Sequence, residues 1–270
     1  MSNNENFQQV LNDLKQKNSE RVLNIWIPSL TRGVKFKHLT LNQQKQLIKS
    51  SVRENLLKLD FSRNIYSILQ DNIIDTDVKI DDLNIIDMIC IGLAYRSADI
   101  GNDYGFYIDD KLFPVDLAKI VEKSRTIDYK SALKTEQIIS DNYHVTIKVP
   151  SINVDRQMNQ HLFEKYKNIP DDTESIKDML ADVYICEAAK YITEMDIVSD
   201  GDNPDSPPVH VDFIDFTAAQ RLQIVEQIPL TVLNQLVSVS DKVQAIESQL
   251  LDVNLGDETA TIEINSAFFT

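Results

Sequence analysis

The sequence predicts an α+β protein, with an N-terminal β-hairpin and helices, a central antiparallel sheet and a mainly helical C-terminal half. Three observations predict this class. Apolar residues recur at helical spacing over several long segments, they alternate with polar residues over shorter segments, and only 6 Gly and 8 Pro interrupt a chain of 270 residues that is 43% apolar. This composition is typical of a folded, helix-rich chain and not of a disordered one.

The first residues of the chain predict a short amphipathic helical arm. Phe7, Val10, Leu11 and Leu14 lie three or four positions apart, which places them on one face of a helix. An arm of this kind is either mobile or docked on a neighbour. We therefore assign Phe7 and Leu11 to partner binding.

A β-hairpin is predicted next. The run RVLNIWIP reads as a strand, SLTRG as a turn and VKFKHLT as a half-exposed strand. Alternation along the second strand places Lys35 and Lys37 on one side and Val34, Phe36 and His38 on the other. Arg32, at the turn before this strand, is assigned to the side of the two lysines. The three basic residues are candidates for binding an acidic surface of a protein partner.

Two helices follow the hairpin. Thr40 stands where an N-cap belongs, before the helical segment LNQQKQLIKSSVREN, in which Leu41, Leu47, Ile48 and Val52 are expected to point inward. A second helix is predicted over residues 60–73.

A third helix contains the most informative stretch, IDMICIGLAYRSADIG. It is expected to start after Asp81-Asp82, because acidic residues stabilise a helix N-terminus. At its end, Arg96 can hydrogen-bond free carbonyl groups and Gly101 permits the chain to turn out. Both residues therefore have a structural role at the end of this helix. A further hypothesis is that Arg96 pairs with a neighbouring acidic segment.

The rest of the chain predicts strands first and helices afterwards. Strands are expected in DYGFYIDDKLFPVDL and NYHVTIKVP, while residues 119–140 stay open between helix and loop. A linker, SDGDNPDSPP, separates later helices from a short strand, VHVDFID, and TATIEIN predicts a closing strand. The later helices are predicted over 155–168, 171–198 and, as a pair separated near Pro229, 217–250.

Several side chains in this part are predicted to be buried. Cys90 and Cys186 are expected to be reduced, buried and apolar in character. The terminal Phe268 and Phe269 are expected to be packed rather than exposed to water, and we assign them to partner binding. The helix over 171–198 is expected to carry an inward stripe of Ile176, Met179, Leu180, Val183, Cys186 and Ala189.

The predicted organisation has three parts. They are a helical arm (1–20), an α+β domain with the hairpin and central sheet (21–150), and a mainly helical domain with short closing strands (151–270).

The net charge of −15 is unevenly distributed. Residues 1–60 hold 10 Lys and Arg against 5 Asp and Glu, whereas residues 171–270 hold 4 against 20. The acidic third repels nucleic acid and anionic lipid, so neither is expected as a partner. No segment reaches the ~20 apolar residues that span a bilayer, and the N-terminus resembles no secretion signal. The asymmetry suits head-to-tail contact with a protein partner, or only a solvated surface.

The usual catalytic motifs are missing from the sequence. It contains no Gly-rich phosphate loop, nucleophile elbow, HExxH or CxxC. Asp200 and Asp202 are the best candidate ligands for a hard cation, with His210 nearby, but turns use the same residue types. We therefore favour a solvated linker and expect no cofactor.

Four blocks of the chain, in order, resemble the T-even-type bacteriophage baseplate hub family. The segment LNIWIPSLTRGVKFKHLTLNQQKQLI resembles the family's hairpin and helix, DFTAAQRLQIVEQIPLTVLNQL its paired C-terminal helices, and TIEINSAFFT its closing strand. IDMICIGLAYRSADIG is similar to its pattern of an acidic residue and an apolar run before Leu-Arg-x-x-Ser-x-Gly. The corresponding positions in this chain are Asp87, Leu93, Arg96, Ser97 and Gly101, and their spacing differs from that of the family pattern.

The resemblance implies a structural component of a contractile phage tail, without enzymatic activity. This component would be a baseplate hub subunit that contacts other hub proteins and the tape-measure protein in an oligomeric assembly. It would lie in the virion tail after synthesis in the host bacterial cytoplasm. Two alternatives stay open: an assembly chaperone absent from the mature virion and, more remotely, a metal-dependent enzyme that uses Asp200, Asp202 and His210.

Overall fold

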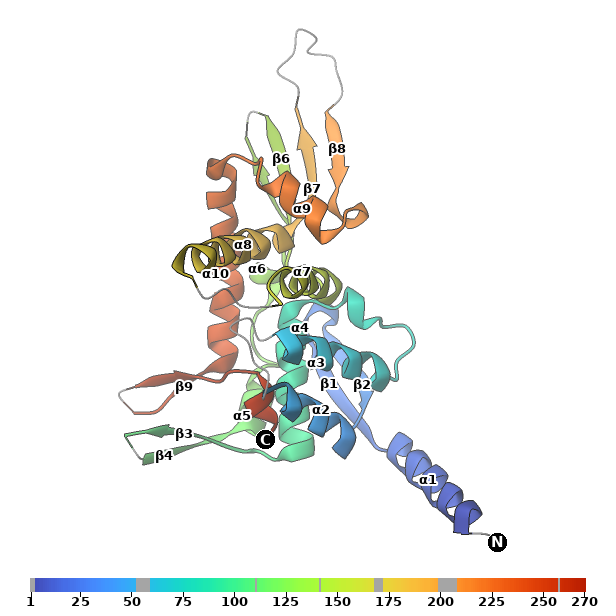
Figure 1. The fold of residues 1–270 in the computed structure, drawn as a ribbon. Coiled ribbons are helices and arrows are strands. Elements are labelled where there is room, and N and C mark those ends of the chain that lie inside the picture. The colour runs from blue at the N-terminus through green and yellow to red at the C-terminus, as the bar shows by residue number, and fades with distance from the viewer. Residues whose placement is uncertain are drawn as a thin grey trace.

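A computed structural model of the chain combines helices with small antiparallel sheets, which confirms the α+β class (Figure 1). The described residues are 3–51, 59–109, 111–140, 142–167, 172–198, 208–256 and 258–270. No helix in these ranges is both long and apolar enough to cross a membrane.

The N-terminal elements follow the predicted order. Helix α1 (Asn3–Glu20) leads directly into the hairpin of β1 (Val22–Ile27) and β2 (Arg32–Lys37). A 3₁₀ turn, Pro28–Leu30, joins the two strands. Val34 and Phe36 are buried and Lys35 and Lys37 are exposed, as alternation along a strand requires.

Helices α2 (Leu41–Ser51) and α3 (Leu59–Asn72) cover the hairpin side of the molecule (Figure 1). The Thr40 hydroxyl accepts a hydrogen bond from the Gln43 amide at 3.2 Å, and the Gln43 side chain accepts one from the Thr40 amide at 2.9 Å. This reciprocal cap confirms the predicted start of α2. Leu41, the first residue of α2, is 68% exposed, so the prediction that it points inward is wrong, whereas Leu47 is buried. Val52 lies outside the described residues.

Helix α4 (Ile85–Tyr95) starts two residues later than the acidic pair suggested, since Asp81 and Asp82 belong to a separate 3₁₀ turn. Asn84 caps the helix: its side chain accepts hydrogen bonds from the amides of Ile86 and Asp87. The helix continues into a π-helical turn, Arg96–Ile100, and ends at Gly101.

A hairpin of β3 (Asp103–Ile108) and β4 (Lys111–Asp116) follows, where the sequence predicted strands. The undecided region 119–140 holds α5 (Leu117–Lys123), α6 (Lys130–Leu133) and β5 (Glu136–Ile139). Strand β5 opens a four-stranded antiparallel sheet in the order β5-β6-β7-β8. Its other strands are β6 (Tyr143–Ile147), β7 (Ile192–Ile197) and β8 (Val209–Asp212).

Strand β7 corrects the prediction of one helix over 171–198. Helix α8 (Thr173–Tyr191) stops at Tyr191, and the chain then pairs on both sides with β6 and β8. These pairings with distant segments override the local helical spacing. The predicted inward stripe of α8 is also wrong at Leu180, which is exposed.

The predicted strand in VHVDFID ends early, because Phe213–Asp215 forms a 3₁₀ turn. Helix α7 (Ile152–Lys165) precedes α8, and α9 (Ala218–Val225) and α10 (Leu230–Leu251) confirm the predicted pair. Pro229 is the N-cap of α10, which fits a residue that cannot donate a backbone hydrogen bond.

The C-terminal segment returns to the N-terminal elements. It comprises β9 (Asp252–Asn254), β10 (Thr259–Thr261) and the 3₁₀ turn Ser266–Phe269. Strand β10 is shorter than the predicted closing strand. Figure 1 shows the C-terminus near α2.

The buried apolar side chains form two clusters. One gathers the first hairpin, α2, α3 and the C-terminal turn, and the other gathers the four-stranded sheet and α7–α10. Helix α4 supplies Ile86 and Cys90 to the second cluster, and Leu93 and Tyr95 to the first. It therefore connects the two. The division at residue 150 stays a prediction.

Candidate functional site

The residues of the matched helix motif connect α4 to the first hairpin. The carboxylate of Asp87 accepts hydrogen bonds from the amide of Ser29 at 2.9 Å and from its hydroxyl at 2.6 Å. Asp87 also accepts one from the Asn84 amide at 2.9 Å. Burial raises the pKa of Asp87, and these donated hydrogen bonds oppose that rise.

The other end of the hairpin is held by Asp99, which the sequence analysis did not single out. Asp99 lies in the π-helical turn after α4, and its carboxylate bonds the His38 ring and accepts a hydrogen bond from the Leu39 amide at 2.8 Å. Two carboxylates from one continuous helical segment thus hold both ends of the hairpin. Helical turns of π type are rare and frequently lie at functional sites.

Arg96 closes the same segment. Its guanidinium donates hydrogen bonds to the carbonyl oxygen of Gly101 at 2.7 Å and to that of Asp103 at 3.3 Å. The predicted hydrogen bonding to carbonyls is confirmed, although these carbonyls follow the helix rather than ending it. Gly101 has a φ of 145°, which only glycine adopts readily. Leu93 is buried and Ser97 bonds Asn102, so the motif serves the fold.

The predicted basic face of the hairpin is largely satisfied within the chain. Arg32 lies 2.6 Å from Asp77 and 3.7 Å from Asp75. Lys37 donates a hydrogen bond to the carbonyl oxygen of Asp71 at 3.3 Å. Lys35 is exposed. This face holds the loop before α4 and provides fewer free cations for a partner than the sequence suggested.

Phe268 and Phe269 correct the prediction that they contact a partner. Both are fully buried in the chain's own core. The Phe269 ring lies 5.8 Å from the Phe61 ring of α3, and the Phe268 ring lies 5.4 Å from that of Tyr104. Large aromatic side chains gain most by burial, so the chain covers them itself. The expectation that they are packed is confirmed.

Helix α1 presents the opposite case. Phe7 is 57% exposed, Val10 and Leu14 are about as exposed, and Leu11 is half-buried. We call these four residues the apolar stripe. Figure 1 shows α1 extending away from the body of the molecule. The stripe therefore remains available to a partner.

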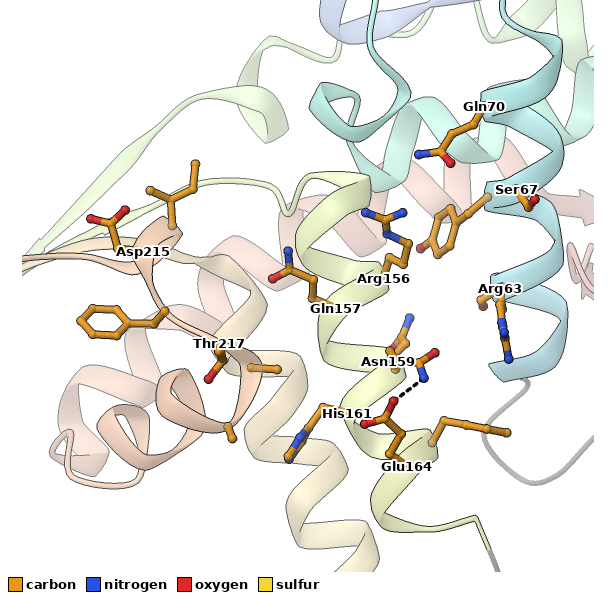
Figure 2. A pocket seen from close by; sticks show the side chains of 18 residues that line it. Arg63, Ser67, Gln70, Arg156, Gln157, Asn159, His161, Glu164, Asp215 and Thr217 are labelled. Carbon is orange, nitrogen blue, oxygen red and sulfur yellow. Dashed lines mark hydrogen bonds between the residues drawn. The ribbon is translucent and has the colours of Figure 1, made fainter.

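A long groove, which the sequence analysis missed, crosses the other half of the molecule. One cavity, of about 770 Å³, lies over α7 between α3 and residues 214–219 (Figure 2). A second, of about 290 Å³, continues between α7, α8 and α9. His161 and Ala219 line both, so we treat them together and call them the trough. Its lining residues come from distant segments, so no local motif could reveal it.

The lining of the trough mixes apolar side chains with charges of both signs: Arg63, Glu164 and Asp215 line the first cavity, and Lys165, Asp182 and Glu226 line the second. Ile214 and Phe216 border the first cavity, and Ile214 is 75% exposed. Glu164 lies at the far end of the α7 face, and Glu226 borders the second cavity. Amphipathic helices dock with their apolar face in hydrophobic grooves, and the apolar part of this trough is the stretch around Ile214 and Phe216.

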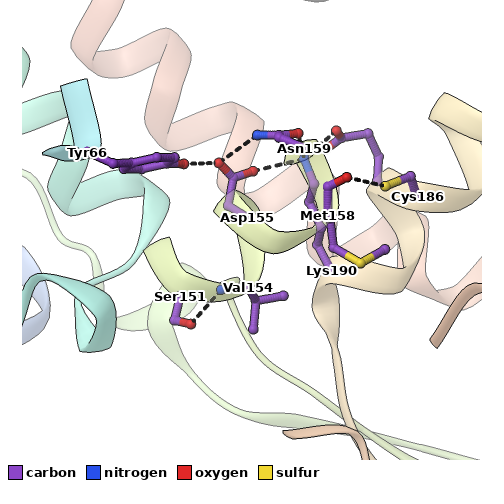
Figure 3. Close-up of polar contacts among 9 residues, drawn as sticks. Tyr66, Ser151, Val154, Asp155, Met158, Asn159, Cys186 and Lys190 are labelled. Carbon is purple, nitrogen blue, oxygen red and sulfur yellow. Dashed lines mark hydrogen bonds and ion pairs between the residues drawn. The ribbon is translucent and has the colours of Figure 1, made fainter. Parts of the chain in front are cut away.

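A buried polar network lies behind the trough and joins α3, α7 and α8 (Figure 3). Lys190, only 4% exposed, lies 2.8 Å from Asp155 and 2.5 Å from Glu187, and Tyr66 donates a hydrogen bond to Asp155. Burial lowers the pKa of Lys190, but the carboxylates outweigh this and hold the pKa above its usual value. Asn159 accepts a further hydrogen bond from Lys190 at 3.0 Å.

Both thiols are buried, as predicted. Burial raises the pKa of Cys90 and of Cys186 to about 12, so each stays protonated at neutral pH.

The alternative metal site is only partly described. Asp200 and Asp202 lie outside the described residues. His210 lies in β8, and its Nδ1 is 2.7 Å from Asp196 of β7. Among the described residues, no group of three His, Cys, Asp or Glu side chains could hold a metal ion.

Comparison with protein-family models, with curated proteins and with solved structures finds no match for this chain. The resemblance to the baseplate hub family therefore rests on the four sequence blocks alone.

Proposed function

We propose that the chain is a structural subunit of a contractile phage tail, located in the baseplate hub and docked on hub and tape-measure proteins through α1. The observation that carries the proposal is the exposed apolar stripe of α1. The proposed role involves no catalytic step, cofactor, nucleic acid or membrane.

The energetics of α1 support docking. Fully burying a Phe, Val or Leu side chain contributes about 1.5–3 kcal/mol, and the stripe leaves most of that unrealised. Most of the stability of a helix in a protein comes from packing of its apolar face, and α1 is rich in Asn, a weaker helix former than Ala or Leu. A partner surface that covers the stripe would stabilise the helix as well as the contact.

The hairpin of β3 and β4 offers a second contact surface. Tyr107 and Leu112 face each other across its strands and are 76% and 55% exposed. Figure 1 shows this hairpin extending from the body beside β9. Aromatic and aliphatic side chains on a projecting element are typical of protein interfaces.

A contact between two of the sequence blocks that resemble the baseplate hub family also supports the proposal. Ser29 and Asp87 belong to two of the resembling blocks, and they bond each other across 58 positions of the chain. A shared fold explains why both blocks would be kept together. The same contacts are internal, which fits a structural protein.

Quantitative peptide mass spectrometry on purified virions and on tail assembly intermediates tests the proposal. A fixed, small number of copies in the finished particle is expected. Presence in intermediates alone would favour the assembly chaperone instead. Absence from both would contradict the proposal.

A further inference from the structure

We propose that a small cavity beside β1 binds an acidic side chain of a protein partner, a glutamate, between the indole N–H of Trp26 and the guanidinium of Arg125. The cavity is lined by residues 23–26 of β1, by α4 and the turn after it, and by the end of α5. We call it the β1 cavity. The inference goes beyond the docking of α1 and does not depend on it.

The β1 cavity lies at the free edge of the first hairpin. The consecutive residues Leu23, Asn24, Ile25 and Trp26 all line it. Because successive side chains of a strand point to opposite faces, a cavity that touches all of them runs along the edge of the strand. Strand β2 pairs with one edge of β1, so the cavity lies at the other edge, where β1 has no second strand partner among the described residues.

Trp26 supplies a hydrogen-bond donor that the fold does not use. Its indole N–H is buried and has no hydrogen-bond partner in the part of the chain that the structure describes. A buried donor left in this state costs about 1–3 kcal/mol. The hydroxyls that line the same cavity point their hydrogens elsewhere, since Ser124 donates to the Val121 carbonyl at 2.7 Å and Ser97 to Asn102 at 2.5 Å. An acceptor brought in by a partner would satisfy the indole.

The charge in the β1 cavity favours an anion. Arg125 is exposed and lines it, and its guanidinium makes no hydrogen bond or ion pair with any described residue. Cys90 also lines the cavity, but burial raises the pKa of its thiol to about 12, so it is neutral. The described lining therefore carries a positive charge and no negative one. Lys35, which lies opposite Asn24 on the same face of the hairpin, is exposed and adds to the positive charge.

The size of the cavity fits one side chain. Its volume is about 140 Å³, well above the roughly 10–15 Å³ that one water molecule needs and below the roughly 300–1,000 Å³ of most small-molecule sites. Leu23, Ala94 and Val121 provide apolar walls for the methylene groups of a glutamate. The net charge of −15 works against polyanions such as nucleic acid and anionic lipid, so a single protein carboxylate suits the cavity best.

An NMR titration of the full-length chain tests the inference at the indole itself. Trp26 is the only tryptophan, so its indole N–H gives a single signal in a ¹H–¹⁵N spectrum. The probe is a pentapeptide with blocked ends and a central Glu. It is expected to shift this signal downfield in a saturable way. The same peptide with Gln is expected to bind about tenfold more weakly, because hydrogen bonds to a charged acceptor are stronger.

Variants of the chain separate the two proposed donors. Arg125→Gln is expected to weaken binding of the Glu peptide about tenfold and to leave binding of the Gln peptide nearly unchanged. Arg63→Gln is the matched control, because Arg63 is exposed on α3 outside the β1 cavity, and it should bind the Glu peptide like the wild type. Both arginines are exposed, so neither change should alter thermal melting. Trp26→Phe keeps a ring but removes the donor, and calorimetry should find weaker binding.

Three results would overturn the inference. The first is an indole signal that the Glu peptide does not shift at any concentration. The second is equal binding of the Glu and Gln peptides, or of the Glu peptide by the wild type and Arg125→Gln. The third is inorganic phosphate that binds the cavity more tightly than the Glu peptide, which would indicate a phosphorylated ligand instead. None of these results depends on the copy number in tails, so this inference and the proposed function can fail separately.

Discussion

Arg96 is a residue of the family-like motif that also stabilises the fold. Its guanidinium holds the carbonyls of Gly101 and Asp103, and the side chain is buried. Arg96→Ala removes both hydrogen bonds and should lower the free energy of unfolding by about 2 kcal/mol. Urea denaturation measures this. Unchanged stability with a selective loss of assembly would show a binding role instead.

Lys190 is the buried charge on which the network behind the trough depends. Lys190→Met keeps most of the volume but leaves Asp155 and Glu187 without their cation. Because removing one partner of a buried ion pair leaves an uncompensated charge, a loss of about 3 kcal/mol in unfolding free energy is expected. Lys177→Met, on the exposed surface of the same helix, is the matched control and should change it little.

His210 gives the fold a measurable pH dependence. The hydrogen bond with Asp196 raises the pKa of His210 above 6.5. The pair therefore stabilises the folded chain below pH 6.5, and this contribution is lost as the pH rises through the folded-state pKa. An NMR titration should find the raised pKa, and Asp196→Asn should return it toward 6.5. Equal values in both chains would contradict the pairing.

At the scale of elements, the C-terminal turn acts as part of the first core. Phe269 contacts Phe61, and its carbonyl accepts a hydrogen bond from Gln44 at 3.1 Å. Phe269→Ala should destabilise the chain by about 3–5 kcal/mol. Thermal or urea unfolding provides the measurement.

Tyr107→Ala is the control for this prediction. Tyr107 is an exposed aromatic side chain, so its removal should change the unfolding free energy by no more than about 0.5 kcal/mol. Equal effects of the two substitutions would show that the C-terminal turn is not part of the core.

Elements with strong local patterns could be predicted from the sequence. The first hairpin, α3 and the pair α9 and α10 follow from alternation, helical spacing and Pro229. Strand β7 could not, because Ile192 and Met195 are spaced as in a helix and only pairing with β6 and β8 makes a strand. Tertiary contacts outweigh local propensity there.

The parts of the candidate site also differ in whether the sequence can predict them. The apolar stripe of α1 is visible in the sequence because four residues of one helix make it. The trough is not, since Arg63, Gln157 and Thr217 come together only through the packing of α3, α7 and α9 (Figure 2). The Lys190 network is likewise built from three helices.

At the scale of the whole molecule, the chain consists of two apolar clusters that share α4, with the network of Lys190 between α3, α7 and α8. Aromatic side chains at the C-terminus are covered internally, while those of α1 and of the β3–β4 hairpin are left outside. The buried aromatic side chains therefore stabilise the fold, and the exposed ones can contact other molecules. This distribution is the basis of the proposed role in an assembly.

The most direct test counts copies of the chain in purified tails by quantitative mass spectrometry, for the wild type and for Phe7→Glu/Leu14→Glu. The account predicts a small fixed number for the wild type and a strong loss for the variant, whose melting temperature should stay unchanged because both side chains are exposed. Equal incorporation of wild type and variant, or absence of the wild type from tails, would contradict it.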